Sequence, residues 1–561
     1  MARRRPVSKL IILTLSSLIA YISIISLVRA VKPSLFVWSE EDLEEAEWLA
    51  TSKSWWDRKF CRFFGLCGIA HVRRDHPGSR SVKIVQDNQS LMDDRDESWR
   101  MDWTVAEDIS ANWTNDEKVL REIPEYVLEY APLVHLFSGE NFWPSDIAEH
   151  LVYTTPQLNY TPVQAKWKHP SLQDLNELNR WELGRYVYLT SDDDVETLPD
   201  WLGSERNVPI PQPGEPVEPE EPDHDTPGNK TPVFNDYDDR NKWYDAGGWD
   251  DPMDAESADP DAFGLKMDSE ELRKRYAGKP IEPVESAEQD SEISRGRSDA
   301  PAVLVVVDKG NDVIDAFWFF FYSYNLGNTV FDVRFGNHVG DWEHTMVRFY
   351  KGHPKALFLS AHTAGEAFSY ESVEKRGKRP VVYSATGTHA MYATPGIHEY
   401  VLPWGLLHDT TDRGPLWDPL YNSHYYTYDY LTDDLRASNL SPLSPTQWFY
   451  FNGHWGDKFY QLGDRRQYRF AGQYHYVNGP LGPRFKHLGR RKVCQGRFEH
   501  SCVIRNSVEE DKRLKRWVGV GVGEEPEDED LGSIMSRRAN ALMMMKNHNT
   551  LSSERDSSSF R

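Results

Sequence analysis

The chain is poor in cysteine and in positive charge. It has 4 Cys among 561 residues, and its 64 Lys and Arg are outnumbered by 88 Asp and Glu, for a formal charge of −24. A protein that neutralises nucleic-acid phosphates needs clustered Lys and Arg, so this charge argues against a nucleic-acid partner. Aromatic residues are abundant at 13%, whereas disordered chains lack such bulky apolar groups. The sequence therefore predicts a folded core.

Common catalytic signatures are also missing. The sequence has no His-Glu-X-X-His zinc motif, no Gly-X-Ser-X-Gly nucleophile elbow and no phosphate-binding loop. An Asp-X-Asp-X-Asp-Gly calcium loop is absent too. No motif therefore identifies a reaction on its own.

Long hydrophobic runs are rare, and the clearest lies at the N-terminus. Basic residues at Arg3–Arg5 precede the apolar run Leu10–Val28. A signal-peptide core usually has about 7–15 residues and a spanning helix about 17–25, so this run predicts one transmembrane anchor. Basic residues before the run favour a cytosolic N-terminus and a lumenal bulk. The alternative is a signal peptide that is cleaved after Ala30 and releases a secreted protein.

Either topology places most of the chain in the secretory pathway, and the sequons agree with that. Asn-X-Ser/Thr tripeptides predict glycosylation at Asn88, Asn112, Asn159, Asn229 and Asn439.

The cysteines form two close pairs, Cys61 with Cys67 and Cys494 with Cys502. In an oxidising lumen such pairs are disulfide candidates. On one straight helix Cys61 and Cys67 would lie about 9 Å apart, beyond the roughly 7 Å limit for a disulfide. Gly65 must then break the helix. A four-cysteine zinc site is the alternative, although the spacing does not match the usual zinc patterns.

Composition divides the chain into consecutive parts. An acidic helix beginning at Ser39 is expected in the N-terminal region, and its Glu residues would be repelled by anionic lipid. The predicted parts are a basic stub with the anchor or signal peptide (1–30), a helical and irregular region (31–125), the first part of a β-rich domain (126–208), an acidic Pro-rich disordered insertion (209–298), the second part of that domain (299–490), a Cys-containing extension (491–520) and a disordered tail (521–561).

From Ala302 onward the pattern is typical of β-strands. The run Val303–Val307, a turn signal at Asp308–Asn311 and the aromatic run Val313–Tyr324 predict a hairpin. Aromatic residues fill both faces of the second strand, which predicts a central strand covered on both sides. Further strands are expected at Thr345–Tyr350, Ala356–Ser360, Val381–Ser384, Trp448–Phe451 and Tyr468–Tyr474.

These patterns predict a mainly β protein. Its centre is expected to be an antiparallel β-sandwich-like domain, with helical N-terminal additions, one N-terminal transmembrane helix and disordered acidic segments.

The segment Gly336–His344 concentrates groups that carry chemistry. In a strand Asp341 and Glu343 point to one face and His344 to the other. Carboxylates on one face, with histidines from neighbouring strands, are suited to acid–base catalysis or to binding a divalent metal. The catalytic candidates are Asp341, Glu343 and His344, and the candidate metal ligands are His338, Asp341, His362 and His389. The alternative is structural, since buried polar groups also pair with backbone groups.

Five stretches carry a resemblance to a known family. They are YAPLVHLFSGENFWPSDI, the block from Ala300 to Phe349 containing GNHVGDWEH, FLSAHTAGEAF with VVYSATGTHAMYATPG, LHDTTDRGPLWDP, and FNGHWGDKFY with GPLGPRFK. Together they resemble the vacuolar protein sorting-associated protein 62 family of fungi, over roughly Tyr126–Lys486 outside the acidic insertion. The resemblance implies a role in delivering proteins to the vacuole, with vacuolar cargo or sorting machinery as partners. It implies no known reaction.

Three functions therefore remain open. The first is a non-catalytic trafficking factor of the secretory or vacuolar pathway, attached to the membrane by its N-terminal helix. The second is a lumenal metal-dependent hydrolase. The third is a lectin-like module, in which the aromatic segments HYYTYDYL and QWFYFNGHWGDKFY would line a sugar-stacking groove.

Overall fold

The structure is a computed structural model of the full chain. The residues that it describes are 23–24, 27–28, 31–32, 39–73, 113–163, 168–180, 184–212, 242–244, 246, 295–362, 364–400, 407–470, 472–495 and 502–508. The chain divides into two compact units, residues 1–67 with 521–561 and residues 68–520, and we describe each by itself.

The first unit contains a helical hairpin, and a disulfide closes the turn that follows its second helix. Helix α2 (Glu40–Thr51) begins at Ser39, whose hydroxyl accepts a hydrogen bond from the Asp42 amide as predicted. Helix α3 (Trp55–Phe64) ends at Gly65, which has a φ of 64°. This left-handed turn leads into β1 (Leu66–Cys67) and brings the α-carbons of Cys61 and Cys67 to 4.3 Å in a disulfide. The predicted helix break and the first disulfide are confirmed.

The predicted transmembrane segment falls largely outside the described part of the chain. Within Leu10–Val28, only residues 23–24 and 27–28 are described. Among the described residues, no helix combines the length and the apolar character needed to cross a bilayer.

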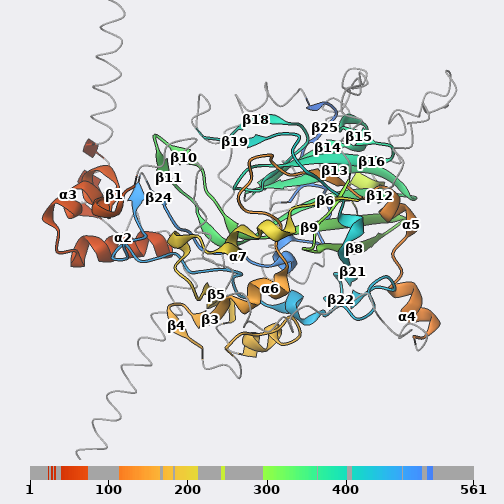
Figure 1. The fold of residues 1–561 in the computed structure, drawn as a ribbon, viewed down its shortest axis with the longest axis horizontal. Coiled ribbons are helices and arrows are strands. Elements are labelled where there is room, and N and C mark those ends of the chain that lie inside the picture. The colour runs from red at the N-terminus through yellow and green to blue at the C-terminus, as the bar shows by residue number, and fades with distance from the viewer. Residues whose placement is uncertain are drawn as a thin grey trace, which may run out of the picture. The chain divides into compact units, whose positions relative to one another are not determined.

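The largest sheet belongs to the second unit (Figure 1). Within the described residues it has eight strands, in the order β22 (Asp434–Ala437), β21 (Ser423–Asp429), β8 (Ala302–Gly310), β9 (Val313–Asn325), β12 (His338–Tyr350), β13 (His353–Ala361), β14 (Ala364–Ser369) and β25 (Ile504–Arg505).

The hairpin of β8 and β9 confirms the sequence prediction. Its tip is Asn311-Asp312, both with positive φ, so the turn lies slightly later than predicted. Strand β9 pairs antiparallel with β8 and β12, and every residue of β9 except Ile314 is buried. The strand with aromatic residues on both faces is therefore central and covered on both sides, as expected.

A second sheet packs on one face of the first. Its order is β15 (Lys375–Arg376), β16 (Arg379–Ser384), β2 (Leu133–His135), β20 (Leu416–Trp417), β7 (Gly296–Arg297) and β6 (Ile210–Pro211), with β17 (Met391–Tyr392) on β16. One core cluster joins the two sheets, with Phe320 and Val347 from the first and Val134, Val382 and Trp417 from the second. The prediction of a mainly β fold is confirmed.

The expectation of an antiparallel arrangement holds for most strand pairs, but both large sheets are mixed. Strands β8 and β21 pair in parallel, as do β2 with β16, β7 with β20, and β14 with β25. Parallel partners require long connections, and such pairings leave no local turn signal in the sequence.

Smaller elements complete the second unit. Among its described residues, the α-helices are α4 (Asn115–Leu120), α5 (Glu125–Glu129), α6 (Ile147–Val152) and α7 (Asp200–Gly203), and the remaining strands are β3 (Thr154–Leu158), β4 (Thr161–Pro162), β5 (Val187–Ser191), β10 (Thr329–Val330), β11 (Val333–Arg334), β18 (Gly396–Glu399), β19 (His408–Thr411), β23 (Arg469–Phe470) and β24 (Gln473–Tyr474).

Two predicted strands are replaced by other structure. The segment predicted as the strand Trp448–Phe451 forms a 3-10 helix over Gln447–Tyr450. Its aromatic side chains mimic a strand pattern, but Trp448 and Phe449 are buried against the large sheet. Residues predicted as the single strand Tyr468–Tyr474 form β23 and β24. Gly472, with a φ of 86°, reverses the chain between them.

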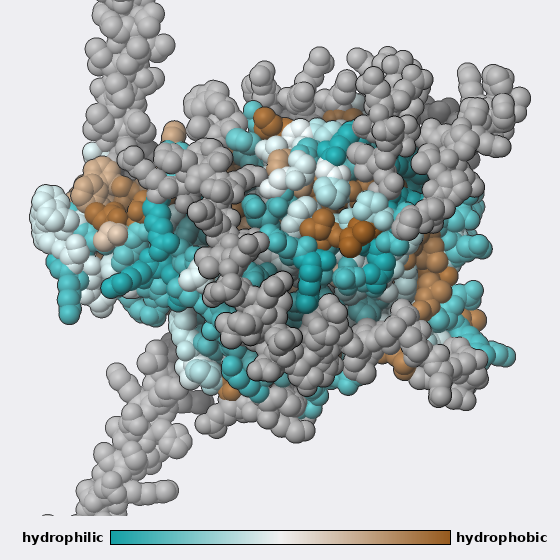
Figure 2. All heavy atoms as spheres, viewed as in Figure 1, coloured by the Kyte–Doolittle hydropathy of each residue, from teal (hydrophilic) through white to brown (hydrophobic). Residues whose placement is uncertain are grey.

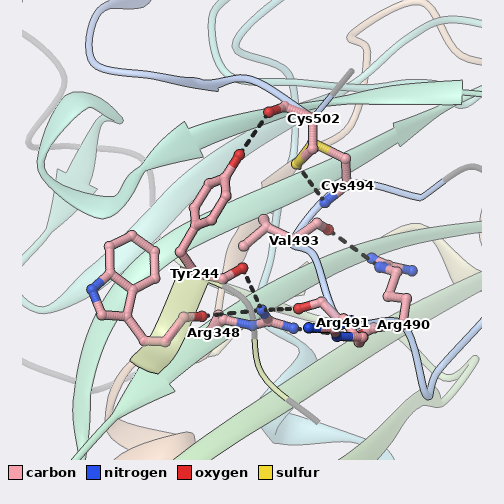
Figure 3. The surroundings of a disulfide bond; sticks show 8 residues. Tyr244, Arg348, Arg490, Arg491, Val493, Cys494 and Cys502 are labelled. Carbon is pink, nitrogen blue, oxygen red and sulfur yellow. Dashed lines mark hydrogen bonds between the residues drawn. A yellow bond between two sulfur atoms is a disulfide. The ribbon is translucent and has the colours of Figure 1, made fainter. Parts of the chain in front are cut away.

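The second disulfide joins Cys494 to Cys502 and lies beside residues of the acidic insertion (Figure 3). In the part of that insertion which the structure describes, Trp243 is buried and the Tyr244 hydroxyl donates to the carbonyl of Cys502. The ends of the predicted insertion also carry β6 and β7. Described residues of the 209–298 segment therefore contribute to the core.

Two of the predicted glycosylation sites lie in the described residues. Asn159 and Asn439 are both exposed. Asn88, Asn112 and Asn229 lie outside the described residues.

Candidate functional site

Two carboxylates of β12 point into the space between the two sheets. Asp341 lies opposite Tyr322 of β9 and Glu343 opposite Phe320, and Phe320 and Tyr322 belong to the cluster that joins the sheets. Gly340 precedes them with a φ of 69°, and a Cβ at this position would lie 2.1 Å from the Trp455 carbonyl oxygen. Only glycine therefore allows β12 to pass Trp455 this closely.

Asp341 forms a buried pair with His389, which lies in the loop between β16 and β17. The His389 Nδ1 is 3.0 Å from the Asp341 carboxylate, and its Nε2 is 3.0 Å from the carbonyl oxygen of Phe142. Both partners are acceptors, so both ring nitrogens carry protons in this arrangement. Burial by itself disfavours the imidazolium, but the Asp341 hydrogen bond and the nearby charge of Glu140 outweigh it and raise the pKa of His389. The imidazole ring also stacks on Tyr322.

Glu343 has the largest carboxyl pKa shift in this cluster. Burial, and then the charge of Asp341, raise its pKa to about 8. The Ser360 hydroxyl of β13 donates a hydrogen bond to its carboxylate. The charge of Lys486 and this hydrogen bond act in the opposite direction. Glu343 is therefore a buried carboxyl group that holds its proton near neutral pH.

His362 forms a second acid–histidine pair, with Asp409 of β19. Its Nε2 donates to the Asp409 carboxylate at 2.8 Å, while 34% of the imidazole side chain is exposed. Asp409 also accepts hydrogen bonds from Asn328, Thr388 and Tyr392. Burial opposes ionisation of Asp409, but His362 and these donors lower its pKa to about 2.

The pair of His362 and Asp409 places the solvent-accessible imidazole of His362 near Glu343. Burial lowers the pKa of His362, but the charge and hydrogen bond of Asp409 outweigh it and, together with the charge of Asp341, raise the pKa. Sequence reasoning missed Asp409, although it follows His408 within a stretch that carried the family resemblance. The sequence does not show that β19 lies beside His362.

Both paired histidines have an unusual backbone conformation. The φ of His362 is 57° and that of His389 is 55°. Residues other than glycine adopt this left-handed region at a cost of about 1–3 kcal/mol, and such residues cluster at functional sites. The two strained residues both direct their imidazoles at carboxylates, which favours a functional role for the cluster.

Of the remaining histidine candidates, His338 lies close enough to Asp341 and His389 for their charges to act on its pKa, which burial lowers, whereas His344 does not join this arrangement. The Nδ1 of His338 is 2.6 Å from the carbonyl oxygen of Gly340. His344 points to the opposite face of the sheet, as predicted, where its ring packs near Phe317, Phe319 and Phe358. Burial lowers the pKa of His344 well below its usual value, so this imidazole remains neutral.

The predicted metal ligands do not converge on one point. Among the described residues, His338, Asp341, His362 and His389 do not supply three donor atoms within 4.8 Å of one another. The group that meets this distance is Glu45 with Cys61 and Cys67, whose two sulfur atoms are already joined in a disulfide. The two carboxylates of β12 are the donors that a hard divalent cation prefers.

The aromatic segments proposed as a sugar-binding groove belong mainly to the core. Fully buried rings include Tyr426, Trp448, Phe451 and Trp455. Their indole and phenyl faces pack against the large sheet, so they are not available for stacking on a sugar. The observation that favoured the lectin-like function is therefore lost.

Comparisons with known proteins give a consistent family. A family model described as "Vacuolar protein sorting-associated protein 62" matches residues 302–461, which include both acid–histidine pairs. In Saccharomyces cerevisiae, the "Putative vacuolar protein sorting-associated protein TDA6" is 34% identical in an alignment of 423 positions that covers 69% of this chain and 72% of that protein.

A second relative from the same yeast and one solved structure also match. The yeast protein "Vacuolar protein sorting-associated protein 62" is 32% identical over 384 residues, which cover 63% of this chain and 64% of that protein, just under two thirds. A solved structure titled "Toxin fold for microbial attack and plant defense" aligns over 28% of this chain and 62% of that one, with 12% identity and a TM-score of 0.14. That TM-score is too low to support an argument.

Proposed function

Because this chain belongs to the vacuolar protein sorting-associated protein 62 family, we propose that it acts in the delivery of proteins to the vacuole. The names of its two yeast relatives carry this proposal. In our proposal the chain is a glycoprotein of the secretory pathway, anchored by its N-terminal apolar segment or released after cleavage at Ala30. Its β-rich part then lies in the lumen and meets cargo or the sorting machinery there.

Three features support the lumenal placement. The apolar run Leu10–Val28 follows basic residues, which favour the cytosolic side of a membrane. Both pairs of cysteines form disulfides, which persist in oxidising compartments. The sequons at Asn159 and Asn439 are exposed, as glycosylation requires.

The first prediction concerns the maturation of a vacuolar hydrolase precursor. In yeast that lacks both relatives, we expect maturation to be delayed and expression of this chain to restore it. If the carboxylate cluster serves this function, an Asp341→Ala/Glu343→Ala variant of equal abundance will not restore it. Pulse–chase labelling of the precursor measures both results.

One control variant and two contrary results make this test decisive. The variant Glu371→Gln changes an exposed carboxyl group and is expected to restore maturation fully. If the double variant also restores it, the cluster is dispensable for sorting. If the unaltered chain fails at normal abundance, the sorting function itself is contradicted.

The second candidate function is binding of a divalent cation by Asp341 and Glu343, as part of a lumenal hydrolase. The observation that favours it is the raised pKa of Glu343, to about 8, caused by burial and by the neighbouring Asp341. A cation between the two carboxylates would compensate both charges, and oxygen ligands suit Ca²⁺, Mg²⁺ or Mn²⁺. In a hydrolase such an ion would supply Lewis-acid activation, while the exposed imidazole of His362 would accept or donate a proton.

The cation proposal predicts stabilisation coupled to proton release. Since Glu343 is protonated below about pH 8, binding near pH 6.5 should release about one proton per ion. Saturating Mn²⁺ or Ca²⁺ should raise the unfolding temperature of the purified full chain by mass action. Calorimetry in two buffers of different ionisation enthalpy measures the proton.

A matched variant tests the ligand. Glu343→Gln should abolish both the stabilisation and the proton release, whereas Glu371→Gln should keep them. Equal stabilisation of all three proteins would show that the ion binds elsewhere, and no stabilisation of the unaltered chain would contradict the cation site.

A further inference from the structure

Helix α3 exposes an unusual number of large aromatic side chains. Trp55 is 53% exposed, Trp56 65%, Phe63 41% and Phe64 60%. Figure 2 shows hydrophobic residues gathered on the surface of this helical hairpin. Soluble proteins usually bury such rings, because each contributes about 150–250 Å² of contact area. An exposed apolar patch of this kind marks a surface that binds another protein or a membrane.

The aromatic residues share one half of the helix. With about 100° between successive residues, the opposite half carries Asp57 and Cys61, both buried. Neighbouring rings along the patch contact one another, with centroids 4.6 Å apart for Trp55–Trp56, 6.5 Å for Trp56–Phe60 and 5.7 Å for Phe60–Phe64. The patch is continuous from the first turn of the helix to the last.

The hairpin does not need these rings to hold its shape. The buried side of α3 is fixed by the Cys61–Cys67 disulfide and by the Trp48 indole, which donates to Asp57 at 3.2 Å. Ser54 and Gly65 cap the two ends of the helix. The exposed rings of Trp55 and Trp56 therefore lie on the side of α3 away from the disulfide.

The charged side chains around the aromatic patch of α3 indicate which kind of surface it binds. Lys59 lies within the patch, with its ammonium group 5.7 Å from the Trp55 ring centroid and 5.5 Å from that of Phe63. Arg58 and Arg62 border the patch, so α3 has two more positive than negative side chains, whereas α2 has six acidic side chains and no basic one. Tryptophan with neighbouring Lys and Arg is typical of the membrane–water interface.

We propose that the aromatic half of α3 lies in the interface of a lipid bilayer, on the lumenal side. This inference rests on the proposed topology, in which the apolar run Leu10–Val28 holds α3 close to that membrane. The exposed Glu47 of α2 then faces water. Anionic lipids are concentrated in the cytoplasmic leaflet, so the lumenal surface does not repel the Glu residues that argued against membrane contact in the sequence.

A single fluorescent probe tests this contact. All 4 cysteines of the chain form disulfides, so Trp56→Cys introduces the only thiol for an environment-sensitive label. The full chain is reconstituted in phosphatidylcholine vesicles with or without a nitroxide-labelled phosphatidylcholine. We expect the nitroxide to quench the label at position 56 by about twofold or more, because an interfacial helix inserts its apolar face about 5–10 Å into the boundary.

The matched control is Glu47→Cys on the exposed side of α2, where we expect no quenching. Quenching at both positions or at neither overturns the inference, as does an emission that is blue-shifted but not quenched, since the rings are then covered by protein. An unfolding temperature of Trp56→Cys equal to that of the unaltered chain shows that the probe leaves the fold intact. Alkaline extraction of membranes shows separately whether the N-terminal segment still anchors the protein. If the segment has been cleaved, the soluble protein is mixed with the same labelled vesicles and the quenching is measured in the same way.

Discussion

Replacing Asp315 by Ala is expected to lower the free energy of unfolding by about 3–5 kcal/mol, because it leaves a buried charge without its partner. Asp315 and Arg348 lie on the neighbouring strands β9 and β12 and are both fully buried, with two hydrogen bonds of 2.7 Å between them. Arg490 also lies nearby, and burial lowers its pKa to about 9 while the charge of Asp315 supports its ionised form. Without Asp315, two buried guanidinium groups would repel each other.

The same arginine holds distant segments together. Arg348 donates to the carbonyl oxygens of Trp243 and Arg491 at 3.1 and 2.6 Å, beside the Cys494–Cys502 disulfide (Figure 3). A double variant, Asp315→Leu/Arg348→Met, removes both charges and should recover part of the lost stability. The recovery should be incomplete because those two carbonyl groups lose their donor.

Urea unfolding followed by tryptophan fluorescence and circular dichroism measures these changes. The control is Asp299→Ala, which breaks an ion pair with Arg297 whose side chains are 55% and 42% exposed, and exposed pairs contribute about 0–1 kcal/mol. A loss below about 1 kcal/mol in Asp315→Ala would mean that water or a rearranged side chain compensates Arg348.

Replacing Glu343 by Gln is expected to remove a strong pH dependence of stability. The folded-state pKa of Glu343 is raised to about 8 from an ordinary value of 4.5. Between these two values the folded protein binds one proton more than the unfolded chain. The unaltered protein should therefore lose about 1.4 kcal/mol per pH unit relative to Glu343→Gln as the pH rises from 4.5 to 8.

Other titratable residues also change the free energy of unfolding with pH. The contribution of Glu343 is therefore obtained from the difference between the unaltered protein and Glu343→Gln. His362 and His389 have raised pKa values, and their stabilisation is present below about pH 6.5 and lost as the pH rises through the folded-state values. Burial lowers the pKa of His150 and His424 to about 4, so their effect is opposite, and stability is lost as the pH falls from 6.5 toward 4.

Urea midpoints at pH 5, 6, 7 and 8 test the prediction. The curves of the unaltered chain and of Glu343→Gln should lie close together at pH 5 and diverge with rising pH. Glu371→Gln, at an exposed position, should parallel the unaltered chain throughout. Parallel curves for Glu343→Gln as well would show that Glu343 is ionised at neutral pH in the folded protein.

Local chemistry explains the predictions that the structure confirms. The β8–β9 hairpin follows from a β-branched run, a turn and an aromatic run that are adjacent in the chain. The break at Gly65 follows from the short separation of Cys61 and Cys67, which a continuous helix cannot bridge. The opposite orientations of Glu343 and His344 follow from the alternation of side chains along a strand. Each of these features depends on residues within a few positions of one another.

By itself, the sequence determined the mainly β class and the central strand with two buried faces, and it indicated the two candidate disulfide pairs that the structure forms. Only the tertiary structure decided which partners the residues of the candidate site meet. Asp341 pairs with His389 across 48 positions and His362 with Asp409 across 47, because the fold brings loops and strands that are far apart in the sequence to the same place. The parallel pairings have the same origin, since they arise from burial of apolar faces between sheets and not from a local turn. The pKa of Glu343 likewise depends on burial between two sheets, which no pattern along one strand reveals.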